Sequence, residues 1–134
     1  MARYSGWGFD LPFTAGEDLS SYQWYFVKPG STAGQVVLAT GGSGPAPIGV
    51  LQNDPKSGEE ATVRIFGTTK VAASAASAIG YGDFVTSNAN GLAILTSASL
   101  KPVSGIALEA CSSGSAIIEV LLLPGFACLA DNTP

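Results

Sequence analysis

The stretch Ala61-Thr62-Val63-Arg64-Ile65-Phe66-Gly67 alternates its side chains in the way that an extended strand requires. Val63 and Ile65 fall on one face of such a strand, whereas Arg64 and Phe66 fall on the other. Turn-forming residues precede this stretch, and similar groups of glycine, proline, asparagine and serine recur along the chain. Short alternating segments between such turns are typical of an antiparallel β-sandwich or β-barrel.

The rest of the chain divides in the same way, and no segment shows a sustained helical repeat. We expect about eight short strands, at residues 22–27, 35–39, 48–52, 61–67, 83–87, 92–96, 103–110 and 116–123. The first of these would place Tyr22, Trp24 and Phe26 on one face. The Ala/Ser-rich residues 71–78 are expected to form a loop or at most two helical turns. The predicted fold is therefore all-β: a compact antiparallel β-barrel or sandwich with an irregular N-terminal arm.

Three parts are expected along the chain. Residues 1–26 hold an aromatic N-terminal arm and the first strand, and glycines and a proline keep the arm irregular up to about residue 18. Residues 27–123 form the β-barrel or sandwich core. Pro124-Gly125 is expected to end the last strand, which leaves residues 124–134 as a C-terminal tail.

A weak internal repeat relates residues 48–66 to residues 104–121, and each copy reads as a strand, a turn and a strand. The two hairpins could pair within one barrel. Arg64 and Glu119 occupy matching places in the two copies, and the sequence leaves open whether they meet.

The composition restricts the classes of function. Of the 134 residues, 46% are hydrophobic and only 12% are charged, so part of the exterior is expected to be buried against another protein. The net charge is −4, and the six basic residues do not cluster, which argues against partners such as nucleic acid or an anionic membrane. The start of the chain lacks a stretch typical of a signal peptide, so we expect a soluble protein made in a cytoplasm.

No group of residues indicates catalysis. Histidine is absent, which removes the commonest general base and metal ligand. The segment Gly41-Gly42-Ser43-Gly44-Pro45 is similar to a nucleophile elbow, but it has proline in place of the last glycine. Glu59 and Glu60 would point to opposite faces of a strand, so together with Asp54 they indicate a solvated turn. We predict no enzymatic activity, no catalytic residues, no cofactor and no metal site.

Two further features have structural explanations. Ile79-Gly80-Tyr81-Gly82-Asp83 looks like a potassium-channel filter, but it lacks the flanking membrane helices and is expected to be a turn that enters a strand. Cys111 and Cys128 match no zinc or redox spacing, so buried free thiols are expected, and a disulfide is left open.

The aromatic residues carry the clearest functional signal, because eight of the twelve lie within the first 26 positions. Aromatic side chains bury a large area at a low entropic cost and are common anchors in interfaces. Tyr4, Trp7, Phe9 and Phe13 are therefore the candidate partner-binding residues. In the alternative interpretation, the arm folds back over one end of the barrel and belongs to the core.

Several segments in order resemble the small capsid cement, or decoration, proteins of tailed bacteriophages. They are Ala46-Pro47-Ile48-Gly49-Val50-Leu51-Gln52, Gly58-Glu59-Glu60-Ala61-Thr62-Val63-Arg64, Gly82-Asp83-Phe84-Val85, Gly105-Ile106-Ala107-Leu108-Glu109-Ala110 and Ile118-Glu119-Val120-Leu121-Leu122. The resemblance covers residues 36–123, and its specificity comes from the order and spacing of the segments. The aromatic arm, residues 1–26, lies outside it.

The resemblance implies a structural virion protein that is not an enzyme. Proteins of this family bind the outer surface of the mature head and stabilise the capsid lattice. The implied partners are the major capsid protein and further copies of the chain, as a homotrimer or a dimer. The implied location is the outer capsid surface, after synthesis in the cytoplasm of the bacterial host. In this reading the arm reaches onto the capsid protein, and deletion of residues 1–16 would leave the fold intact and abolish capsid binding.

Other classes of protein remain open at this stage. A phage tail or baseplate β-domain shares this composition. A surface glycan-binding β-domain would use Tyr and Trp as stacking platforms. An enzyme that relies on carboxylates alone would lose turnover when Asp54 or Glu59 is replaced by alanine.

Overall fold

The computed structural model describes residues 7–41, 46–96 and 102–128 of the chain. Within these ranges the chain forms nine strands and no helix. The strands are β1 (Gly8–Ala15), β2 (Phe26–Pro29), β3 (Gln35–Leu38), β4 (Gly49–Leu51), β5 (Glu60–Ala75), β6 (Phe84–Ser87), β7 (Ala93–Leu95), β8 (Pro102–Ala107) and β9 (Gly114–Cys128). The predicted all-β class is thus confirmed. It follows that no helix in the described part of the chain could cross a membrane.

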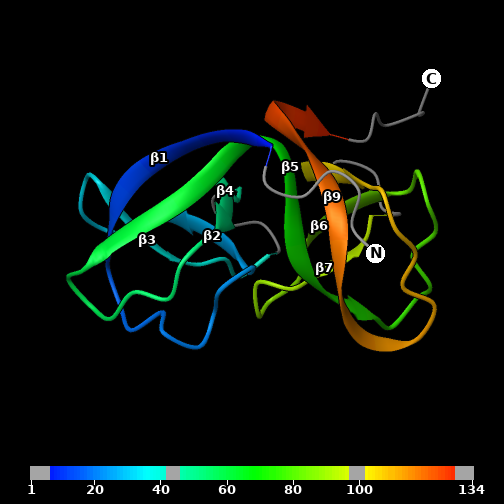
Figure 1. Cartoon of the computed structure of the whole chain (residues 1–134), viewed down its shortest axis with the longest axis horizontal. Coiled ribbons are helices and arrows are strands. Elements are labelled where there is room, and N and C mark those ends of the chain that lie inside the picture. The colour runs from blue at the N-terminus through cyan, green and yellow to red at the C-terminus, as the bar shows by residue number, and fades with distance from the viewer. Residues whose placement is uncertain (1–6, 42–45, 97–101, 129–134) are drawn as a thin grey trace, which may run out of the picture.

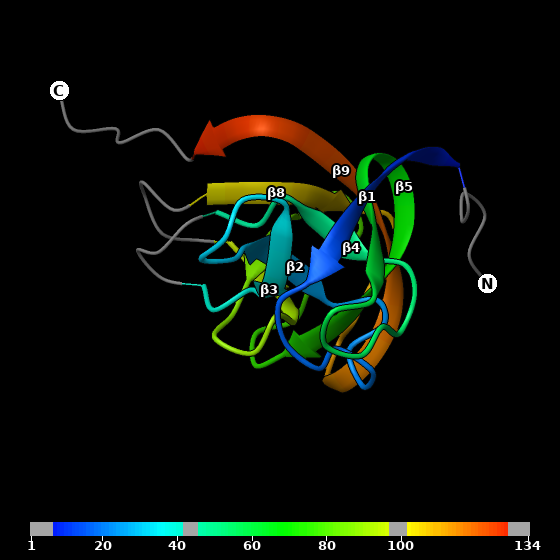
Figure 2. The ribbon, with the colours of Figure 1, turned by 90° about the vertical axis from the view of Figure 1, so that its left-hand side faces the viewer.

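The strands are joined into two rings that share β5 (Figure 1). The first ring runs β1-β3-β2-β4-β5 and is closed by pairing between β5 and β1. The second runs β5-β7-β6-β8-β9 and is closed by pairing between β5 and β9. Figure 2 views the molecule from the side of the first ring, where β1 lies across β5. The long strand β5 is therefore the element that joins the two halves of the molecule.

Gly67 marks the point at which β5 passes from one ring to the other. It lies opposite Gly8 of β1 and also opposite Leu122 of β9. Its φ is +101°, a conformation that side-chain-bearing residues rarely adopt. A Cβ atom at Gly67 would lie 2.5 Å from the Cα of Gly8 and 2.5 Å from the carbonyl oxygen of Trp7. Only glycine allows β1 to approach β5 this closely.

Each ring encloses apolar side chains. The first ring surrounds a core that includes Leu19, Val27, Val36, Leu51 and Val63. The core of the second ring is formed chiefly by residues of β5, β6, β8 and β9, and it also takes in Phe26 and Val50 from the first ring. The two rings therefore pack directly on one another.

The repeat found in the sequence corresponds to two antiparallel strand pairs, β4 with β5 and β8 with β9. The two hairpins join through the long ladder between β5 and β9. Arg64 and Glu119 form no ion pair with each other, because the guanidinium of Arg64 binds Asp10 instead.

The N-terminal arm differs from its prediction, because residues 8–15 form β1 rather than an irregular segment. β1 pairs with β5 from Gly8 to Thr14. Its pairing with β3 involves only Thr14 and Ala15, so Pro12 needs no backbone donor toward β3. This one-sided pairing explains how a strand can contain a proline.

Two other segments also differ from their predictions. Residues 22–25 form turns rather than a strand: the Tyr22 amide donates to the Leu19 carbonyl and the Tyr25 amide to the Tyr22 carbonyl. Trp24 within them has a φ of +74°. Residues 71–75 belong to β5 rather than to a loop or helix, since each pairs with a residue of β9.

The sheet also departs from the antiparallel prediction at two pairings, because β1 with β3 and β5 with β7 are parallel. The expected end of the last strand at Pro124-Gly125 is also wrong, because β9 extends through these two residues to Cys128.

Candidate docking surface

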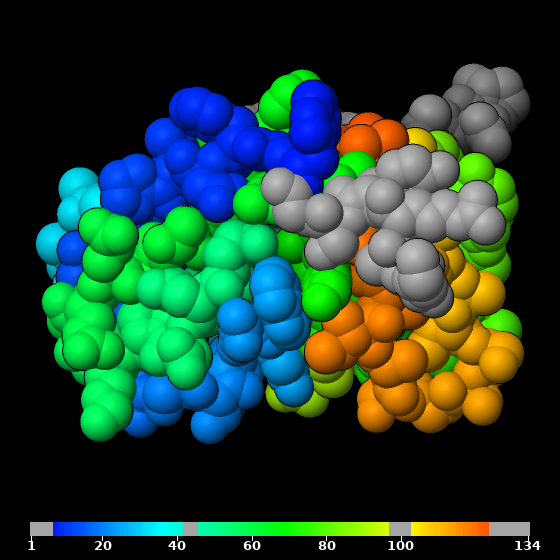
Figure 3. Space-filling model, viewed as in Figure 1, coloured from blue at the N-terminus to red at the C-terminus, as the bar shows by residue number. Residues whose placement is uncertain are grey.

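Three aromatic side chains stand together on the outside of β1 and β5. Phe9 and Phe66 lie opposite each other in the antiparallel ladder, which places their side chains on the same face. The Trp7 ring lies 6.2 Å from the Phe66 ring, centroid to centroid. The exposed fractions are 66% for Trp7, 56% for Phe9 and 47% for Phe66. We call these three residues the aromatic face. In Figure 3 the start of β1, drawn in blue, stands at the molecular surface.

The backbone beneath the aromatic face is held firmly. The carbonyl oxygen of Trp7 accepts hydrogen bonds from the amide of Thr68, at 2.7 Å, and from the Thr68 hydroxyl, at 3.2 Å. The next residue, Gly8, pairs with Gly67. Trp7 thus combines an exposed ring with an anchored backbone.

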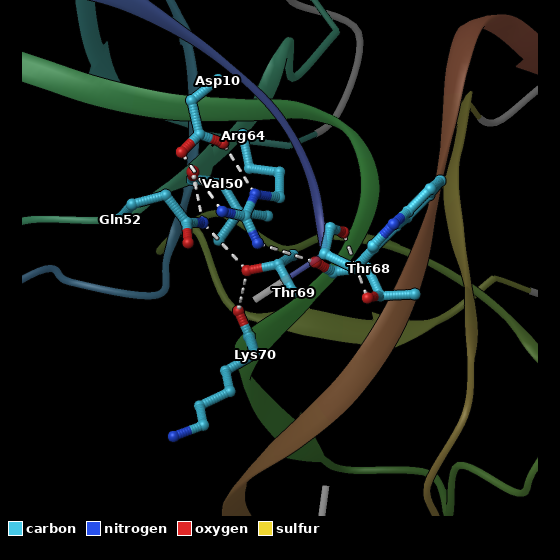
Figure 4. Close-up of polar contacts among 8 residues, drawn as sticks. Asp10, Val50, Gln52, Arg64, Thr68, Thr69 and Lys70 are labelled. Atoms are coloured by element: carbon cyan, nitrogen blue, oxygen red, sulfur yellow. Dashed lines mark hydrogen bonds and ion pairs between the residues drawn. The ribbon is translucent and has the colours of Figure 1, made fainter. Parts of the chain in front are cut away.

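A buried arginine joins the two strands that carry the aromatic face (Figure 4). The Arg64 Nε donates to Asp10 Oδ1 at 2.7 Å, and Nη2 donates to Asp10 Oδ2 at 3.2 Å. Nη1 donates to the Thr68 carbonyl at 3.0 Å. Two-point bonding between a guanidinium and a carboxylate is among the stronger polar contacts in proteins.

A second polar group ties β4 to β5 (Figure 4). The Gln52 side-chain amide donates to the Val50 carbonyl at 3.0 Å and to the Thr69 hydroxyl at 2.9 Å. The Thr69 hydroxyl in turn donates to the Lys70 carbonyl at 3.0 Å. These bonds satisfy polar atoms beside Gly67, where β5 changes partners.

The structure separates the four predicted partner-binding residues. Trp7 and Phe9 lie together and are exposed. Phe13 is half-buried and packs against the core of the first ring, as the core alternative predicted for the arm. Tyr4 lies outside the described residues. Sequence reasoning missed Phe66, although the alternation of residues 61–66 already placed it on the face opposite Val63. The binding role of these residues stays a prediction.

Where the structure describes them, the other candidate motifs stabilise turns. The carboxylate of Asp83 accepts a hydrogen bond from the Gly80 amide and so closes the turn that carries Tyr81. Glu59 accepts a hydrogen bond from the Lys56 amide within its turn. Ser43 lies outside the described residues. Within the described ranges, no three Asp, Glu or Cys side chains lie close enough together to hold a metal ion.

Cys111 is a buried free thiol, as expected. The side chain of Cys128 lies outside what the structure describes.

Glu119, which matches Arg64 in the sequence repeat, is a buried acidic residue whose burial the sequence did not predict. Its side chain is fully buried on β9, and neither carboxylate oxygen has a hydrogen-bond partner. Burial raises the pKa of Glu119, and the negative charge of Glu109 raises it further, against smaller opposing effects of Lys70 and Arg64. The only sequence signal was its position, which matches that of Arg64 in the repeat.

The fold of the chain is similar to that of a known phage head protein. The crystal structure of the N base of head fiber gp8.5 of bacteriophage phi29 aligns with a TM-score of 0.59 and 20% sequence identity. The alignment covers 89% of this chain and 97% of that chain. At this identity the likeness establishes the fold. No curated protein sequence matches the chain.

The family model of the phage cement proteins matches residues 23–122. The chain therefore belongs to the phage cement protein family, and it is a structural protein associated with the phage capsid. The matched region contains β2 to β8 and most of β9. It excludes β1 and the residue before it, so Phe9 and Trp7 lie outside the region that defines the family, whereas Phe66 lies within it.

Proposed function

We propose that the protein binds the outer surface of the mature phage head and stabilises the capsid lattice without enzymatic activity. Its partner is the major capsid protein, and the aromatic face is the part that docks. The observation that carries this proposal is the exposure of three adjacent aromatic rings on an anchored backbone. Membership of the phage cement protein family supports a partner on the phage capsid.

Exposed apolar side chains cost free energy in water, and ordering side chains on binding costs entropy. A contiguous group of exposed aromatic rings is unusual on a protein that functions alone and marks interaction sites. Tyr, Trp and Phe are common anchors because they bury a large area with few rotatable bonds. The low charge content of the chain also suits a protein that is covered on part of its surface.

Binding of this kind stabilises a capsid by mass action. A protein that binds the assembled lattice more tightly than the separated subunits shifts the equilibrium toward the lattice. Many copies on one shell multiply the effect of a modest affinity at each site. The proposed location is accordingly the outer capsid surface, after synthesis in the cytoplasm of the bacterial host.

We also propose that the chain associates with itself, as a homotrimer or as a dimer. Tyr81 and Phe84 support this proposal, because both are exposed. Phe84 lies on β6 and Tyr81 in the turn before it, and β6 pairs with neither of the strands β1 and β5. They leave a second apolar area for contacts between copies. The mass of the free protein, measured by light scattering, distinguishes the trimer, the dimer and a monomer.

Co-sedimentation with expanded heads that lack the protein tests the docking proposal. We expect saturable binding at a fixed ratio to the major capsid protein. A variant with Trp7, Phe9 and Phe66 all changed to alanine should lose binding, whereas Ile117→Ala should retain it as the control for the loss of an exposed apolar side chain. Failure of the wild-type protein to bind heads would reject the proposal in favour of a tail, baseplate or glycan-binding role.

A further inference from the structure

We infer that Arg64 is a positioning residue that holds the aromatic face in its binding geometry. This inference rests on the proposed docking function. Arg64 does not itself reach a partner: it is buried, and each of its three guanidinium nitrogens already donates a hydrogen bond within the protein. Its effect on binding would pass through Trp7 and Phe9.

The need for such a residue comes from an irregularity in the ladder between β1 and β5. The register shifts between Phe9 and Asp10, so that Phe9 lies opposite Phe66 whereas Asp10 lies opposite Arg64. A shift of this kind interrupts the regular backbone hydrogen bonding. Trp7 and Phe9 lie beyond the interruption, at the end of the strand.

Arg64 spans this interruption with its side chain. Two of its nitrogens bind the carboxylate of Asp10 on β1, next to the shift. The third binds the carbonyl of Thr68, the residue whose amide and hydroxyl bind the carbonyl of Trp7. One side chain therefore connects both ends of the short segment that carries the exposed rings (Figure 4).

Gly8 makes room for this arrangement. A Cβ atom at Gly8 would lie 2.7 Å from Cδ of Arg64, so the arginine side chain passes directly against the backbone of β1. The aliphatic part of Arg64 thus supports the strand, while its guanidinium bonds to it.

Positioning changes affinity because ordering exposed side chains and loop backbone on binding costs free energy. Trp7 and Phe9 are mostly exposed and gain little order from packing. Loss of the link between Arg64 and Asp10 would leave the end of β1 freer in the unbound protein. The bound geometry would then be reached at a higher cost in entropy.

A double-mutant cycle on full-length protein binding to expanded heads tests the inference. Arg64→Met keeps the aliphatic stem and removes the guanidinium, and Asp10→Asn is a second variant that keeps the local shape. Each should weaken binding by roughly tenfold, since each removes charge-assisted hydrogen bonds. Lys28→Met is the matched control, because it removes a positive charge on β2, a strand that pairs with β3 and β4. This control should bind like the wild type.

The same two substitutions, added to a Trp7→Ala, Phe9→Ala background, should change the remaining affinity by less than about twofold. Full additivity in this background would overturn the inference, because Arg64 would then act independently of the aromatic face. Unchanged head binding by folded Arg64→Met and Asp10→Asn proteins would overturn it as well.

A spectroscopic readout separates this inference from the docking proposal. The chain has two tryptophans, so Trp24→Phe leaves Trp7 as the sole indole. Time-resolved fluorescence anisotropy of the free protein should show faster local motion of Trp7 after Arg64→Met or Asp10→Asn. Unchanged motion would reject the positioning role even if the wild-type protein binds heads. Faster motion in a protein that does not bind heads would reject docking alone.

Discussion

Glu119 of β9 lies opposite Lys70 of β5, yet its buried carboxylate is left without a hydrogen-bond partner. The Lys70 ammonium lies instead 5.7 Å from the centroid of the Trp24 ring. Burial and the negative charge of Glu109 raise the pKa of Glu119 in the folded protein. Glu119 is therefore an acid that folding holds in its protonated form over a wider pH range than water does.

This arrangement predicts how stability depends on pH. Below the ordinary pKa of 4.5, Glu119 is protonated in both the folded and the unfolded protein and contributes no pH dependence. Above it, the unfolded chain loses the proton first, so the free energy of unfolding falls as the pH rises toward the raised pKa of the folded state. Above the raised pKa of the folded state, Glu119 is ionised in both states, and its contribution to the free energy of unfolding no longer changes with pH.

Glu119→Gln should remove this dependence, because the amide carries no charge to desolvate. We expect the stability of the variant relative to the wild type to increase as the pH rises from 4 to 7. Urea unfolding at a series of pH values measures the difference. Glu60→Gln, at an exposed site, is the control and should follow the wild-type curve. A constant gap between Glu119→Gln and the wild type from pH 4 to 7 would contradict the explanation.

Gly67→Ala should destabilise the protein more than a positive φ alone explains. The new Cβ would collide with the backbone of Trp7 and Gly8. Gly58→Ala is a matched control, since Gly58 has a φ of +86° and nothing lies within 4 Å of the new atom. We expect a loss of about 1 kcal/mol for the control and at least about 2 kcal/mol for Gly67→Ala. Equal losses in denaturant titrations would mean that β1 does not approach β5 closely at this position.

Phe66→Ala and Phe13→Ala should have opposite profiles. Phe66 is exposed, so its removal should change the free energy of unfolding by less than about 0.5 kcal/mol while weakening head binding. Phe13 is half-buried against a core, so its removal should cost about 1–2 kcal/mol of stability and leave binding unchanged. Chemical denaturation and co-sedimentation measure both quantities. Strong head binding by Phe66→Ala would remove this residue from the aromatic face.

Deletion of residues 1–16 should unfold the first ring. The interpretation of the N-terminal residues as a docking arm predicts an intact fold after this deletion. In the structure, however, β1 closes the first ring by pairing with β5, and Ala15 is buried. The exposed edge of β5 and the opened core around Val63 would cost stability. Circular dichroism and thermal unfolding of the truncated chain test this expectation. A truncated protein as stable as the wild type would show that β1 is dispensable for the fold.

Parts of the fold followed from local pattern, and other parts depended on distant contacts. The alternation of residues 61–66 predicted a strand correctly, because that pattern is local. Residues 71–75 carry a weak Ala/Ser pattern and become a strand only because β9 pairs with them. The pattern of residues 22–27 predicts a strand that contains Trp24, whereas local hydrogen bonds and a positive φ put this residue in a turn. Propensity is a weak guide where pairing between distant segments decides the outcome.

The candidate site was likewise predictable from the sequence only in part. The concentration of aromatic residues near the N-terminus drew attention to Trp7 and Phe9, which are exposed. Only the register of β1 with β5 shows that Phe66 joins them and that Phe13 turns to the core. The partner of Arg64 is likewise a long-range contact, since Asp10 lies 54 positions away in the chain.

A reconstruction by electron cryomicroscopy of expanded heads saturated with the purified protein tests the docking proposal most directly. The proposal predicts added density on the outer surface of the shell, with Trp7, Phe9 and Phe66 at the contact with the major capsid protein. Shells without added density, or density attached through the opposite side of the molecule with the three rings facing solvent, would contradict it.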